Sequence, residues 1–230
     1  MAETRRRRGS GAAESAARRE TPTETRSSHL MCLGLSLLTG LDFQRISSKK
    51  GTGERMGIYS SRDFIKEAKS NPENFYIIHY SCQSLYDDNE ALSPRITSIA
   101  ISHYATEQIV SFSTHSIAEE LHIPRENVRD RFDEVERRLL QDFYAFVRDR
   151  RDKYWIHWNM RNLTYGFEHL EHRYRVLGGN DAPIIPVERR LNLNDLLADR
   201  YGGGYAKHPK VKALIEMNGG IYRHLLSGGG

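Results

Sequence analysis

The chain has 230 residues, of which 38% are hydrophobic and 28% charged, with 2 Cys and a formal net charge of +4. Its length and apolar content suffice to bury the core of one domain, and they exclude a wholly disordered chain, a disulfide scaffold and a collagen-like chain. Residues 1–55 hold 11 Lys and Arg against 6 Asp and Glu, a net charge of +5, so residues 56–230 carry −1. The basic character therefore belongs to one end of the chain and is no argument that the domain binds nucleic acid.

The chain divides at about residue 55. The residues before the apolar run 30–41 are mostly Arg, Ser, Thr, Gly, Ala and Glu without aliphatic periodicity, and the run itself is too short to span a membrane. We expect a disordered basic leader over 1–55, which is not part of the native protein if Met56 is the start. The domain then covers 56–230, and its glycine-rich end suggests truncation at the C-terminus. With only two cysteines and no membrane span, we expect a cytoplasmic protein.

The first predicted elements are one helix and three strands. An amphipathic helix over 62–69 has Ser61 as its N-cap. Residues 75–80 are β-branched and aromatic without polar alternation, which is typical of a strand covered on both faces. Strands over 95–103 and 108–113 follow and are joined by a short hairpin connection. Together they predict an antiparallel β-meander.

Helices dominate the second half of the chain. A helix over 126–151 carries one apolar stripe, which consists of Phe132, Val135, Leu139, Phe143 and Phe146. The charged face of this helix is expected to be solvated. A strand over 154–158 precedes a helix that runs from an Asn162 cap to Leu177, and Asn194 and Pro209 open two more helices. The predicted fold class is α/β, a mixed sheet with an antiparallel β-meander followed by alternating helix and strand.

A family resemblance rests on four segments and on the helix 126–151. The segments are FYIIHYSCQS, RITSIAIS, IVSFSTH and WIHWNMRN. Over about residues 72–218 the chain resembles the ribonuclease-H-like fold of the DEDD 3′–5′ exonucleases. That family uses four carboxylates to hold two divalent metals, which activate water and stabilise the leaving oxygen. The resemblance implies a ribonuclease-H-like domain with its site at the ends of the first and fourth strands.

This sequence departs from the family pattern at the catalytic acids. The position of the first Asp resembles His79, that of the paired Glu resembles Ser81, and Asn162 stands where an acid follows the motif residue Asn159. Neutral groups do not offset the charge of Mg²⁺, because hard cations prefer carboxylate oxygen. We therefore expect a degenerate exonuclease-like domain without a metal site or a cofactor.

The expected role of this domain is to bind nucleic acid, a nucleotide or a protein partner in the crevice at the strand ends. The candidates for catalytic positions are His79, Ser81, His157 and Asn162. The candidates for contacts to nucleic acid are Gln83, Asn159 and Arg161.

Two alternatives remain open. One is an active nuclease that uses Mg²⁺ or Mn²⁺ with Asp87, Asp88 or Glu90 from the first loop and His157. The other is a regulator that binds DNA through a helix-turn-helix over 116–132. His122 stands where such a turn usually has Gly, which favours instead an edge helix leading into a core helix.

Two smaller features carry chemistry of their own. Cys82 is a nucleophile if His79 or His157 serves as its base, although a lone buried thiol is the simpler interpretation. His169 and His172 are spaced i, i+3 on a helix, which is compatible with a metal, although a pair on the surface is favoured.

Overall fold

The computed structural model describes residues 60–83, 93–161 and 163–218. Predictions that concern the leader 1–55 and Cys32, the loop acids Asp87, Asp88 and Glu90, the cap Asn162 and the C-terminal end beyond residue 218 lie outside the described residues.

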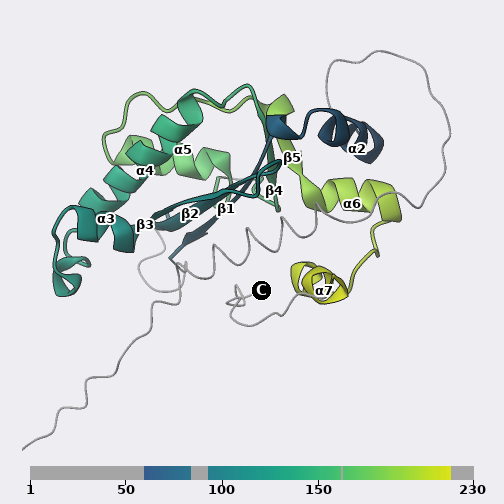
Figure 1. The fold of residues 1–230 in the computed structure, drawn as a ribbon. Coiled ribbons are helices and arrows are strands. Elements are labelled where there is room, and N and C mark those ends of the chain that lie inside the picture. The colour runs from purple at the N-terminus through teal and green to yellow at the C-terminus, as the bar shows by residue number, and fades with distance from the viewer. Residues whose placement is uncertain (1–59, 84–92, 162, 219–230) are drawn as a thin grey trace, which may run out of the picture.

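A five-stranded mixed sheet forms the centre of the fold (Figure 1). Its order is β3-β2-β1-β4-β5, with β2 antiparallel to β1 and β3, and with β4 parallel to β1 and β5. The α/β class and the meander are confirmed. The strands are β1 (Phe75–Cys82), β2 (Ile96–His103), β3 (Ile109–Ser113), β4 (Tyr154–His157) and β5 (Arg190–Asn192).

Helices α4 (Phe132–Arg148) and α5 (Phe167–Val176) pack on one face of the sheet. The predicted stripe of α4 is confirmed, and it contacts the side chains of Ile78 and Tyr80 in β1. The charged face is not wholly solvated, because Glu136 is buried. Among the described helices none is long and apolar enough to cross a membrane.

The other face is covered by α2 (Ser61–Ser70), α6 (Leu193–Tyr201) and α7 (Lys210–Met217). Side chains of β1 alternate between the faces, so Phe75 and Ile77 belong to this second core. This alternation explains why β1 shows no polar period, since both of its faces are buried. Figure 1 shows α2 and α6 beside each other.

Several predicted boundaries are shifted. Helix α5 begins at Phe167 with Gly166 as its N-cap, four residues after the predicted cap, because residues 161 and 166 first form an isolated β-bridge. Strand β5 was not expected, since three residues give no periodicity to detect. The N-cap of α6 is Asn192 rather than Asn194.

The helix-turn-helix segment has one helix before the long one. Helix α3 (Thr114–Glu120) ends in a Schellman motif, with His122 at φ 53° and the Ile123 amide donating to the Ala118 carbonyl at 2.8 Å. A 3₁₀ turn at Arg125–Asn127 follows, and α4 starts only at Phe132. The structure thus has a short turn where a recognition helix would need to lie.

Candidate functional site

The carboxyl ends of β1, β4 and β5 lie along one edge of the sheet, because the three strands are parallel. The strand order reverses here, since the chain leaves β1 toward β2 on one side and leaves β4 toward β5 on the other. Open α/β sheets place ligands outside such strand ends. We call this the carboxyl edge, and it is the candidate site.

A polar network joins the ends of β4 and β5. The side-chain oxygen of Asn192 accepts from the backbone amides of Asn159 at 3.1 Å and Asn194 at 3.3 Å. Its amide nitrogen donates to the side chains of Asn159 at 3.2 Å and Asp195 at 3.0 Å. Asn159 itself has a φ of 52°, in the left-handed region that asparagine tolerates best after glycine. The network therefore fixes the loop after β4 against the first turn of α6.

Arg161 is the exposed cation of this network. Its Nη2 donates to Asp195 at 2.5 Å and to the Asn159 side chain at 3.2 Å. The side chains are 48% and 59% exposed for Arg161 and Asp195, so water screens their attraction. The Arg161 amide donates to the Tyr165 carbonyl at 3.0 Å, which holds its backbone in place.

A second ion pair lies close by, between Glu168 in the first turn of α5 and Arg190 in β5. His157 lies between the two pairs and is buried. Burial lowers its pKa to about 4, and the charges of Arg161 and Arg190 add to that effect. Its Nδ1 accepts from the Met160 amide at 3.2 Å, so the neutral ring carries its proton on Nε2. His157 is a neutral structural side chain at physiological pH.

Tyr165 crosses the end of β1. Its ring stacks on Tyr80 at 4.5 Å between centroids, and its hydroxyl donates to the Tyr80 carbonyl at 3.1 Å. With that proton engaged, His79 Nδ1 donates to the same hydroxyl at 3.2 Å. Burial lowers the pKa of His79 to about 4, so it is neutral as well. Tyr165 therefore covers the carboxyl end of β1 at Tyr80 and His79.

The structure brings the predicted residues together but does not expose all of them. His79, His157, Asn159 and Arg161 lie on the carboxyl edge, and the two histidines are buried rather than lining an open crevice. Gln83 is exposed, and its backbone amide donates to the Arg95 carbonyl at 2.8 Å.

Ser81 is half-buried and pairs with Ser98 of β2. It therefore contributes to the strand pairing beside the edge rather than to an exposed surface.

Four residues of the edge were not predicted: Tyr165, Glu168, Asn192 and Asp195. A signal existed for two of them, since an Asn followed three positions later by an acid is typical of a helix start. Asn192 and Asp195 have this spacing, and Asn192 is the cap, two residues before the predicted Asn194. Tyr165 and Glu168 gave no local signal, because their roles depend on partners in β1 and β5.

Cys82 and the histidine pair have structural environments. Burial raises the pKa of the Cys82 thiol from 9.0 to about 11, which opposes its role as a nucleophile. His169 is buried while His172 is exposed, so the surface-pair interpretation is wrong. Within the described part of the chain, no group of three or more His, Cys, Asp or Glu could hold a metal ion.

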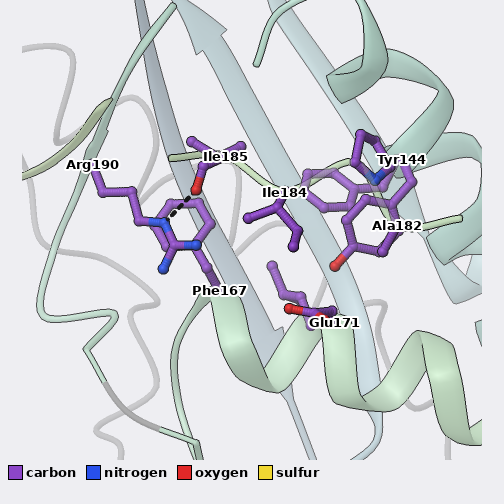
Figure 2. A pocket seen from close by; sticks show the side chains of 10 residues that line it. Tyr144, Phe167, Glu171, Ala182, Ile184, Ile185 and Arg190 are labelled. Carbon is purple, nitrogen blue, oxygen red and sulfur yellow. Dashed lines mark hydrogen bonds between the residues drawn. The ribbon is translucent and has the colours of Figure 1, made fainter. Parts of the chain in front are cut away.

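A separate hollow lies between α4, α5 and the segment 182–185 (Figure 2). Its walls are mainly apolar, with Arg190 at one side donating through Nε to the Ile185 carbonyl at 2.9 Å. It has room for about one water molecule. The hollow is too small to be the site of an organic ligand.

Comparison of the chain with protein-family models, curated proteins and solved structures gives no match. The function of the domain is therefore inferred from the geometry of the carboxyl edge.

Proposed function

We propose that the chain is a degenerate ribonuclease-H-like domain that binds single-stranded nucleic acid at the carboxyl edge and does not cleave it. The observation that carries this is the placement of Asn159 and Arg161 where the strand order reverses, with Gln83 at the end of the neighbouring strand. Their amide and guanidinium groups suit phosphate and base edges.

The fold assignment is supported by topology. Strand β2 is antiparallel to its neighbours, and the other strands share one direction, as expected of a ribonuclease-H-like sheet. The long helix α4 connects the meander to β4, and α5 connects β4 to β5, both on one face. This is the order of elements that underlies the resemblance.

Binding is favoured over cleavage by the state of the acids. Glu168 and Asp195, which lie close to His157, each form an ion pair with an arginine. To bind Mg²⁺ or Mn²⁺, these carboxylates would have to exchange a guanidinium for the metal. The alternative nuclease needs Asp87, Asp88 or Glu90, and incubation of oligonucleotides with a divalent metal tests for it.

The test of binding is fluorescence anisotropy of labelled poly(dT) and poly(U) with the full chain. We expect binding that weakens with salt, and a loss of about tenfold in affinity for Arg161→Ala or Asn159→Ala. Arg151→Ala is the matched control, because Arg151 is exposed before β4 at the opposite edge of the sheet. Equal affinity for all four proteins would refute the site.

The same oligonucleotides are then incubated with Mg²⁺ or Mn²⁺, with EDTA as the control. Intact strands are expected. Metal-dependent shortening from the 3′ end, abolished by EDTA, would replace this proposal with the nuclease alternative.

A further inference from the structure

The guanidinium of Arg161 is only partly engaged in the free protein. Both of its side-chain contacts, to Asp195 and Asn159, use Nη2. Within the described residues Nε and Nη1 form no hydrogen bond or ion pair, and the side chain is 48% exposed. A guanidinium binds phosphate through two parallel donors, and each such pair includes Nη2, so bidentate binding of a phosphate by Arg161 requires Nη2 to leave Asp195.

Asp195 has the opposite character, since both of its carboxylate oxygens are engaged. Oδ1 accepts from Arg161 at 2.5 Å and Oδ2 accepts from the Asn192 side chain at 3.0 Å. The carboxylate thus accepts from two donors, Arg161 after β4 and Asn192 at the end of β5. An anion that displaced it would meet the same guanidinium and the same side-chain amide.

We propose that Asp195 is an internal competitor for Arg161, and that a phosphodiester of a bound nucleic-acid strand takes its place. This inference rests on the proposed function. It adds that Asp195 neutralises the charge of Arg161 when no nucleic acid is bound. The exchange is feasible because the ion pair is exposed and screened, whereas a buried pair would resist it. The Asn192 and Asn159 side chains remain as the fixed part of the site.

The test compares Asp195→Asn with the unchanged chain in the poly(dT) assay. We expect the variant to bind about fivefold more tightly, because the oligonucleotide no longer competes with a carboxylate. Asparagine keeps a side-chain oxygen in the first turn of α6, and a thermal melt of each protein checks that the fold is retained.

Two further variants separate competition from a general charge effect. Glu171→Gln removes the same charge from the middle of α5, where Glu171 pairs with Arg175, and is expected to leave binding unchanged. In an Arg161→Ala background, Asp195→Asn is expected to have no effect, since the competition needs the guanidinium. Titration with inorganic phosphate tests whether a free anion suffices.

Each outcome decides the matter. Tighter binding that depends on Arg161 supports the inference. The inference is overturned if Asp195→Asn leaves poly(dT) binding unchanged, or if an equal gain occurs in the Arg161→Ala background or in Glu171→Gln. It is also overturned if Asp195→Asn binds inorganic phosphate more tightly but poly(dT) no more tightly. If neither the unchanged chain nor Asp195→Asn binds poly(dT), the proposed function fails together with this inference.

Discussion

The phenol of Tyr80 donates a hydrogen bond of 2.9 Å to Nδ1 of His169 in the core. The direction follows from the other partners, since the phenol accepts from the Gly166 amide and His169 Nε2 donates to the Pro94 carbonyl, both at 2.9 Å. Burial raises the pKa of Tyr80 and lowers that of His169 to about 4, so both stay neutral. The relay connects β1, α5 and the residues before β2.

We expect the protein to lose stability steeply in mild acid. His79, His157 and His169 have pKa values lowered by burial from 6.5 to about 4. Between these values the unfolded chain binds protons that the native chain does not, so stability falls as the pH drops from about 6.5 to about 4. Each histidine costs about 1–2 kcal/mol at pH 5, which together approaches the stability of a typical domain.

Urea denaturation at several pH values between 7.5 and 4.5 measures this dependence. His169→Gln, which keeps a side-chain donor for Pro94, is expected to reduce the slope by about one proton. Equal stability at pH 7 and pH 5 would contradict the prediction, because it would mean that the native protein binds protons at the three histidines by pH 5 as the unfolded chain does.

The buried ion pair of Glu136 and Arg173 is expected to be sensitive to the loss of one partner. Arg173 donates to both carboxylate oxygens, at 2.9 and 2.6 Å, and the side chains are 0% and 6% exposed for Glu136 and Arg173. Glu136 also accepts from the Ile96 amide at 2.8 Å. Glu136→Gln leaves a buried guanidinium without its counter-charge, which costs about 3–5 kcal/mol.

The matched control is Glu134→Gln, two residues earlier on the exposed face of α4, where Arg131 forms an ion pair of 2.7 Å. It is expected to change the free energy of unfolding by less than about 0.5 kcal/mol. Urea midpoints measure both. Equal effects in the two variants would mean that burial does not govern the cost.

His122→Gly is expected to stabilise the protein by about 0.5–1 kcal/mol. His122 has a φ of 53° and its amide donates to the Glu119 carbonyl at 3.0 Å, the position at which helix ends prefer glycine. His115→Gly, inside α3, is the control and costs about 1 kcal/mol. A lower melting temperature for His122→Gly would contradict the prediction.

Cys82 is expected to react slowly with iodoacetamide. A pKa raised from 9.0 to about 11 leaves about a hundredfold less thiolate at neutral pH than an ordinary thiol has. The measurement uses the Cys32→Ser variant, in which Cys82 is the only cysteine, with glutathione as the reference. Labelling as fast as glutathione would restore the nucleophile interpretation.

Local periodicity made much of the fold predictable. The stripe through Phe132, Val135 and Leu139 identified α4, and the continuous apolar run of β1 identified a strand with two buried faces. Such signals need only neighbouring residues. Strand β5 could not be predicted, because Arg190–Asn192 is too short to show a period and is stabilised by its pairing with β4.

The candidate site was predictable only in part, for a related reason. That His79, His157, Asn159 and Arg161 follow strands, and so gather at one edge, could be inferred from their places in the sequence. That the histidines are buried and neutral depends on Tyr165 and on neighbouring arginines, which the strand pattern does not reveal.

The sequence by itself determined the α/β class, the meander, α4 and the place of the polar residues after β1 and β4. Only the tertiary structure decided their partners. Arg161 meets Asp195 across 34 positions and Glu136 meets Arg173 across 37, because β5 pairs with β4 and α5 packs on α4. Periodicity reports which face of an element is buried, whereas the charge and proton of a side chain depend on groups that packing brings close.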